Sequence, residues 1–249
     1  MRLIFTELKR AILSKRFLIA VIGYALLLCI GVTEYWNDSA VYNFSIAYKT
    51  AFYMACFLCA ALPFADSFLQ DCRSGFWRSV VLRSDISRFC AAKPVVVFLS
   101  GFLAVTFASC LFICYLLIVF PIDNDFHIDY SGYDALLNEG HYVLYFGVKI
   151  LLTAWSSAMM AVICLALSNI MKNTYALLVA PPLLYYVQNE IANAYISPEW
   201  QLTRMLYTPL ETFGGMANNI LVSLSLWSCI AAFAGFLFYI QARRKLRNA

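Results

Sequence analysis

One polar stretch of the chain, residues 66–93, separates two long apolar runs and determines how both are interpreted. Its sequence is DSFLQDCRSGFWRSVVLRSDISRFCAAK. Four apolar side chains in it follow the spacing i, i+1, i+4 and i+5, which places them on one face of a helix. They are Phe76, Trp77, Val80 and Val81. Gly75 supplies a break in front of them. The pattern predicts a short amphipathic helix over residues 75–82, lying at a membrane surface.

The composition is that of a membrane protein. Of the 249 residues, 63% are hydrophobic and only 13% are charged, a balance that does not fit a water-soluble domain. The apolar residues form runs of about 17 or more, close to the length that crosses a ~30 Å hydrocarbon core. We predict an all-α integral membrane protein, a single transmembrane domain over residues 1–249 with six spans. The spans are predicted over residues 17–33, 45–64, 94–120, 145–167, 175–188 and 220–240.

Residues 1–16 form a second amphipathic segment. One side of its helical wheel is apolar, and Glu7 lies on the opposite side with most of the cations. The apolar side chains are Ile4, Phe5, Leu8 and Ile12. Because the segment carries five cations, it is too polar to cross a membrane. We expect an interfacial helix on the inner surface, with its cations near anionic headgroups. The alternative is a cytosolic extension that only orients the first span.

Prolines mark predicted breaks in the spans. Pro63 is expected to kink or end the second span, and Pro94 is expected to begin the helix of the third. Pro181 and Pro182 remove two backbone donors and are predicted to break the fifth span. The segment after it, residues 189–219, is predicted to be irregular and broken on the outer side.

The cations are distributed unevenly between the two sides of the predicted membrane. Fifteen of the 18 Lys and Arg residues fall in segments assigned to the inside, and only 3 fall outside. The inside segments are the N-terminal helix, residues 66–93, the turn 168–173 and the C-terminal tail. The positive-inside rule therefore predicts that both termini are cytoplasmic.

The motifs of catalytic and metal sites are missing. The sequence contains neither a P-loop nor an H-E-x-x-H motif, and no Ser/His/Asp set can be assembled from its two histidines. The acidic loop 121–143 lacks the Gly and the final Glu of a calcium-binding loop. The nine cysteines fall in predicted spans or inside loops, so disulfides are not expected.

We predict no enzyme activity, no metal, no cofactor in this chain and no nucleic-acid partner. Neither the buried charge nor the repeat that would indicate a secondary carrier is found.

The layout resembles the permease subunits of type-2 ATP-binding-cassette (ABC) exporters over the whole chain. That family tends to show an acid, a small-residue turn, an apolar helix, a Ser-Arg pair and a Lys before the third span. The matching residues are Asp71, Ser74-Gly75, Phe76 to Leu82, Ser87-Arg88 and Lys93. The pair Asp85-Ile86 stands where the family often has proline.

The resemblance implies a multi-pass protein of a bacterial cell membrane. Two permease copies, forming a homodimer, would work with two copies of an ABC ATPase subunit that binds ATP and Mg. Helix 75–82 would be the coupling helix, and the turn 168–173 would make a second contact with the ATPase. The residues expected at this contact are Asp71, Arg73, Gly75, Phe76, Trp77, Arg78, Val80, Val81, Arg83, Arg88 and Lys172.

The cargo is expected to be amphipathic or hydrophobic. The small size is similar to permeases that export, or give immunity to, antimicrobial and toxin peptides, including phenol-soluble-modulin exporters. Spans rich in aromatic residues suit such a cargo. The alternatives are a lipid or drug exporter permease, a secondary carrier or channel, and a membrane scaffold without transport. In the last two cases Phe76 and Trp77 would be lipid anchors.

Overall fold

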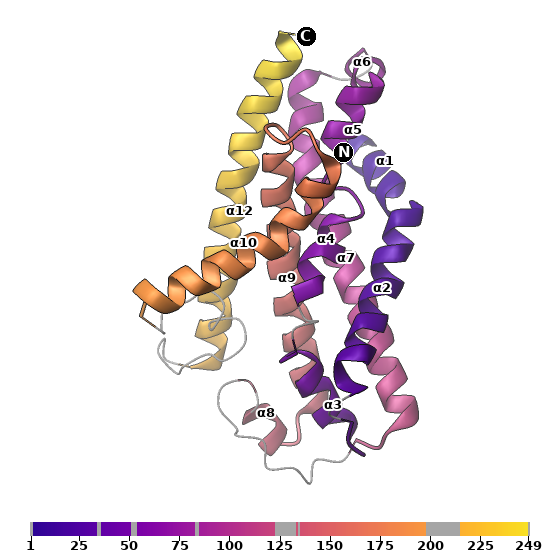
Figure 1. Ribbon diagram of the computed structural model, residues 1–249, viewed down its shortest axis with the longest axis vertical. Coiled ribbons are helices and arrows are strands. Elements are labelled where there is room, and N and C mark those ends of the chain that lie inside the picture. Colours follow the sequence, from indigo (N-terminus) through magenta and orange to yellow (C-terminus); the bar gives the residue numbers. More distant parts are fainter. Residues whose placement is uncertain are drawn as a thin grey trace.

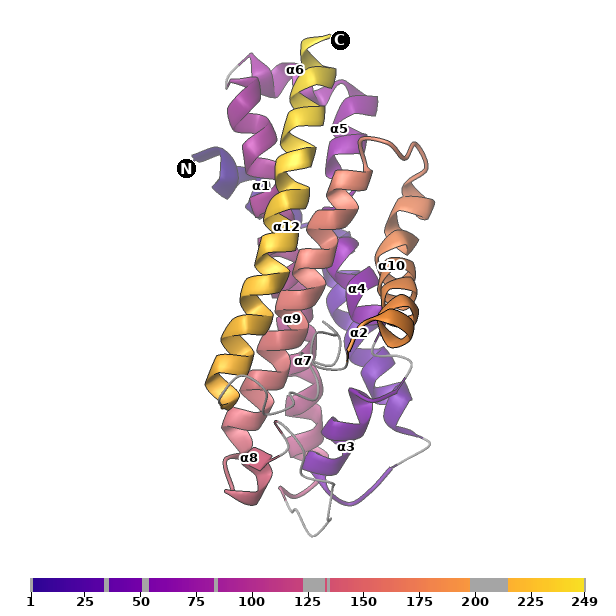
Figure 2. The same ribbon diagram turned by 90° about the vertical axis from the view of Figure 1, so that its left-hand side faces the viewer.

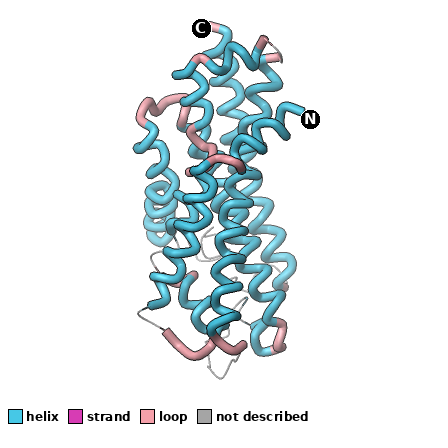
Figure 3. Tube along the Cα trace, turned by 90° about the vertical axis from the view of Figure 1, so that its right-hand side faces the viewer, coloured by secondary structure: helices cyan, strands magenta, loops and turns pink. Residues whose placement is uncertain are grey.

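The computed structural model of the chain is an elongated bundle of helices (Figure 1). It describes residues 2–33, 36–50, 54–82, 85–122, 133, 135–197 and 215–248. Within these ranges every regular element is a helix, as the tube drawing shows (Figure 3). The all-α prediction is confirmed.

Four helices run along the long axis of the bundle (Figures 1 and 2). They are α2 (Lys15–Val32), α7 (Ile86–Val119), α9 (Tyr142–Leu167) and α12 (Met216–Arg247). Each is long and apolar enough to cross a membrane. They correspond to the first, third, fourth and sixth predicted spans, and they indicate a membrane protein.

Helix α9 is the central helix of the bundle. In its most apolar stretch 72% of the residues are buried, against 17% in α12. It packs against α7, α12 and α4 (Ala55–Ala61). Helix α7 also packs closely against α4, because a glycine lies at their contact. Between α7 and α4, a Cβ added at Gly101 would lie 2.8 Å from the backbone oxygen of Ala60.

The predicted second span, residues 45–64, is divided. Helix α3 (Ala40–Ala47) is followed by a turn over residues 48–50, and α4 begins at Ala55. Pro63 lies in a turn after α4, as predicted, and α5 (Ser67–Ser74) follows it. Neither α3 nor α4 is long enough to be a span alone, so in the described residues no long helix covers the second predicted span.

Three prolines, Pro94, Pro181 and Pro182, lie inside helices, which corrects two predictions. Helix α7 begins at Ile86, so Pro94 is inside it rather than at its start. Helix α10 (Thr174–Tyr195) runs unbroken through Pro181 and Pro182. Pro181 offers no N–H to the carbonyl of Leu177, and the thiol of Cys164 on α9 donates to that carbonyl instead, at 3.0 Å. A tertiary contact thus compensates for the lost backbone donor.

The outer segment, residues 189–219, also differs from its prediction. Helix α10 crosses the bundle obliquely (Figure 1) and continues through Tyr195, so residues 189–195 are helical rather than irregular. Helix α12 likewise begins at Met216, within the predicted segment, and continues past residue 240 to Arg247. Residues 198–214 lie outside the described residues.

The basic segments gather at one end of the bundle. Helices α1 (Arg2–Ile12), α5 and α6 (Phe76–Val81), the turn 168–173 and the end of α12 all lie there (Figures 1 and 2). Helices α3 and α8 (Ala135–Asn138) lie at the opposite end. We call the first the basic end. Its placement in the cytoplasm remains a prediction.

Candidate functional site

The corner between α5 and α6 lies at the basic end of the bundle (Figures 1 and 2). Gly75 makes the corner with a φ of 69°, a left-handed conformation that glycine adopts without strain. The predicted break at Gly75 is therefore present, and the helix after it spans Phe76–Val81, close to the predicted 75–82.

The predicted apolar face of α6 is partly packed against the core and partly exposed. Trp77 and Val80 pack against the core, and Val81 is half-buried. Phe76 remains 40% exposed, and Leu82 after the helix is 88% exposed. The helix has no fully buried residue. It therefore keeps an open apolar edge at the end of the molecule.

Arg73 joins this corner to the second predicted contact. Its guanidinium donates to the backbone oxygen of Lys172 and lies 3.5 Å from the hydroxyl of Thr174. The turn 168–173 is thereby held beside α5. The two segments expected to contact a partner form one surface, although about 100 residues separate them in the chain.

A buried ionic cluster fixes α5 from the other side. The ammonium of Lys93 lies 2.5 Å from Asp71 Oδ2 and 2.9 Å from Glu7 Oε2. Arg10 Nη2 lies 3.0 Å from Asp71 Oδ1, and Arg10 Nη1 lies 3.7 Å from Glu7 Oε2. Two cations thus face two anions, and the formal charges cancel. Because an unpaired buried charge is strongly unfavourable, this pairing lets three charged side chains be buried between α1, α5 and α7.

Aromatic rings extend the cluster to α6. The ammonium of Lys93 lies 4.7 Å from the ring centre of Phe64 and 5.0 Å from that of Phe89. The guanidinium of Arg10 lies 4.7 Å from the ring centre of Phe76, within the range of a cation–π interaction. Arg10 therefore contacts both the buried anions and the exposed aromatic residue of α6.

A second ion pair holds the beginning of α5. Arg16 Nη1 lies 2.9 and 2.8 Å from the two carboxylate oxygens of Asp66, and Gln70 donates to the same carboxylate at 2.6 Å. Asp66 is buried, and it ties α5 to the first residues of α2. Helix α5 is thus anchored through two acids, Asp66 and Asp71.

The remaining predicted residues are distributed around this cluster. Arg78 is exposed and lies 5.6 Å from the ring of Trp77, while Arg88 is exposed in the first turn of α7. Arg83 lies outside the described residues. On α1, Ile4, Leu8 and Ile12 pack partly against the core, whereas Phe5 is 72% exposed.

The structure corrects two points of the sequence interpretation. Glu7, assigned to the polar side of α1, is buried against Lys93. Buried charges were not found from the sequence, yet Glu7, Asp71 and Lys93 are buried, and so is Lys149 on α9. The available signal was that Glu7, Asp66 and Asp71 are acids placed within otherwise basic segments, where pairing is expected.

Comparisons of the chain with protein-family models, curated proteins and solved structures gave no match.

Proposed function

We propose that the chain is the transmembrane subunit of an ATP-driven ABC exporter and works with a separate ATPase subunit. The observation that carries this proposal is the surface formed by the α5–α6 corner and the turn 168–173, joined by Arg73. This surface lies at the basic end, where a cytoplasmic ATPase would dock. Its cargo would be amphipathic or hydrophobic, with antimicrobial or toxin peptides as the first candidates.

The open edge of α6 supports the docking role. Phe76 and Leu82 are exposed apolar side chains, and Arg73 and Arg78 lie close to them in the chain. Buried aromatic anchors commonly carry the energy of an interface, and charges beside them set its orientation. A groove on an ATPase that receives Phe76 would therefore hold α6 in one orientation.

The ion pairs give α6 a way to move the rest of the chain. A displacement of α6 passes to α5 across Gly75, and from Asp71 to Lys93 on α7. Arg10 carries the same displacement to α1. Closure of two ATPases on ATP would in this way tilt α1 and α7 together and change access to a path between two permease copies. ATP and Mg would bind only to the ATPase subunits.

A secondary carrier is the second candidate, and the buried charges favour it. Lys93, Glu7 and Asp71 are ionisable groups inside a chain with four candidate spans, which is a common feature of ion-coupled transport. A carrier of this kind would transport its substrate without any ATPase.

Affinity purification of the tagged chain in mild detergent from native membranes, followed by mass spectrometry, tests the proposal. We expect an ATPase with a P-loop in about equal amount. Phe76→Ala should lower its recovery, whereas Trp36→Ala at the opposite end, with a similar exposed fraction of 42% against 40%, should not. An intact chain recovered without any ATPase would exclude the exporter and leave the carrier.

A further inference from the structure

An apolar groove of about 640 Å³ lies on the bundle surface where α1, α2 and α7 meet. Its walls are apolar side chains from the elbow between α1 and α2 and from the middle of α7. They include Ile12, Leu13, Phe17, Leu18, Phe107 and Leu111. Leu18 and Leu111 are 60% and 51% exposed, so the groove opens sideways toward the surroundings of two candidate spans.

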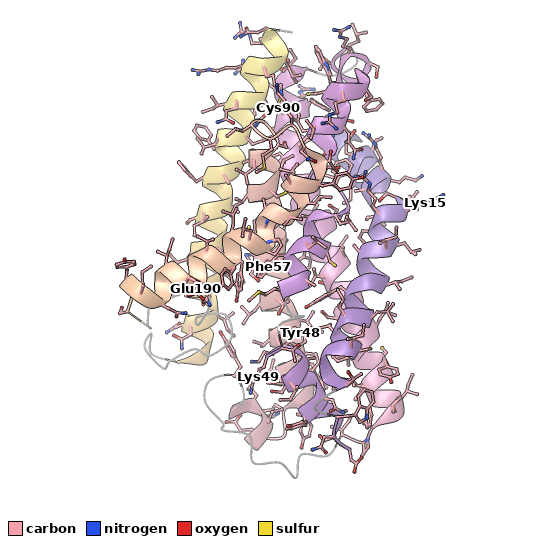
Figure 4. All side chains as sticks on the ribbon, in the orientation of Figure 1. Lys15, Tyr48, Lys49, Phe57, Cys90 and Glu190 are labelled. Atoms are coloured by element: carbon pink, nitrogen blue, oxygen red, sulfur yellow. The ribbon has the colours of Figure 1, made fainter. Side chains whose placement is uncertain are left out.

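One cation borders this groove. Lys15 is the first residue of α2, lines the groove, and projects from the bundle (Figure 4). Within the described residues it has no hydrogen bond or ion pair, in contrast to the neighbouring Arg16, which binds Asp66. Ser14, which also lines the groove, already has hydrogen-bond partners within the chain. Its hydroxyl donates to the carbonyl of Ala11 and accepts from the amide of Phe17.

The start of α2 favours an anion beside Lys15. A helix N-terminus carries partial positive charge, and the first turn of α2 contains no acid to balance it. The nearby acids Glu7, Asp66 and Asp71 are engaged in internal ion pairs. The positive charge at the mouth of the groove is therefore left for a ligand from outside the chain.

We propose that this groove binds an anionic phospholipid of the surrounding bilayer, with an acyl chain along α2 and α7 and the phosphate at the ammonium of Lys15. An apolar groove with one cation at its end matches a ligand with an apolar tail and an anionic head. The proposal requires that the chain lies in a membrane. It does not require that the chain is an exporter.

Photo-crosslinking of the purified full chain in phosphatidylcholine nanodiscs tests this site. The probe is a small amount of phosphatidylglycerol with a diazirine on its acyl chain, and mass spectrometry of peptides locates the adducts. We expect adducts on residues 17–21 and 107–114 in excess over the exposed apolar face of α12 around Phe233 and Phe236. Unlabelled phosphatidylglycerol should compete with the probe, and added phosphatidylcholine should not.

Two variants and one control distinguish the contribution of the headgroup contact to lipid binding from that of the apolar groove. Since one cation near an anionic lipid contributes about 1 kcal/mol, Lys15→Gln should lower the groove adducts about fivefold. Lys9→Gln is the matched control, because Lys9 is an exposed cation of α1 that does not line the groove. Leu111→Trp should obstruct the part of the groove beside α7 and lower the adducts while Lys15 is intact. Leu111 is half-exposed, so the larger side chain should not prevent folding.

Equal adducts from labelled phosphatidylcholine and phosphatidylglycerol, unchanged by Lys15→Gln, would mean nonspecific boundary lipid and would overturn the proposal. Displacement of the probe by an amphipathic peptide, but not by phosphatidylglycerol, would also overturn it and assign the groove to cargo. Because no ATPase is present, either result leaves the exporter proposal to its own test.

Discussion

Lys93 keeps its ammonium group away from water between two carboxylates. Its removal leaves Glu7 and Asp71 with Arg10 as their one remaining cation among the described residues. Breaking a buried ion pair by removing one partner typically costs about 3–5 kcal/mol. We expect Lys93→Ala to lower the free energy of unfolding by about this amount, measured by denaturant titration in mixed micelles. The control Lys9→Ala removes an exposed cation of α1 and should change stability by less than about 0.5 kcal/mol.

A double-mutant cycle shows whether that loss arises from the pair. Asp71→Ala alone should also destabilise the protein, because it leaves Lys93 and Arg10 facing the single carboxylate of Glu7. The double variant Lys93→Ala, Asp71→Ala should lose clearly less than the sum of the two single losses. Strict additivity would mean that the two side chains act independently and that the cluster does not join α5 to α7.

Gly101 is required by the close approach of α7 to α4. The Cβ of an alanine there would lie 2.8 Å from the backbone oxygen of Ala60, a contact that only a backbone shift can relieve. We expect Gly101→Ala to destabilise the protein by about 1–3 kcal/mol, as overpacked cores do. Gly23→Ala is the control: no atom lies within 4 Å of its added Cβ, so the change should be neutral or stabilising. Equal thermal midpoints for the two variants would contradict the tight contact.

At the level of elements, the path of α10 depends on a thiol from another helix. Cys164→Ala should weaken the protein by about 0.5–1.5 kcal/mol, because the carbonyl of Leu177 loses its donor. In a Pro181→Ala background the new backbone N–H can bond this carbonyl, so the same Cys164→Ala change should cost almost nothing. Thermal unfolding of the four proteins measures this. A Cys164→Ala loss that is the same in both backgrounds would show that packing, rather than the thiol donor, is responsible.

The same contact explains which elements were predictable from the sequence. The long apolar helices follow from run length alone, and the corner at Gly75 follows from a local backbone preference. The expected break at Pro181 considered only the donor lost within the helix, whereas the compensating thiol comes from α9. The burial of Glu7 was missed for a similar reason, since its partner Lys93 is 86 residues away. Local patterns therefore predicted the elements, and side-chain partners distant in sequence decided the exceptions.

Across the whole molecule, the direction of each segment bears on the number of membrane passages. Arg16 contacts Asp66 at the basic end, whereas the amide of Ala40 donates to the carbonyl of Pro121 at the other end. The chain between residues 40 and 66 thus runs back along the bundle, although no long helix covers it. Residue 174 lies beside Arg73 at the basic end, and α12 begins again toward the other end, so the chain returns there too. Six passages remain a prediction, because the structure has four candidate spans among its described residues.

Six passages would place both termini on the same side of the membrane, and from the cations at the basic end we predict that this side is the cytoplasm. Epitope tags at residue 1 and at residue 249 should therefore bind antibody only after the cells are permeabilised. A tag inserted after Gly140, an exposed turn residue at the opposite end, should bind antibody on intact cells. Labelling of only one terminus on intact cells would require an odd number of passages, so one of the two returning segments, 40–66 or 174–216, would not cross the membrane.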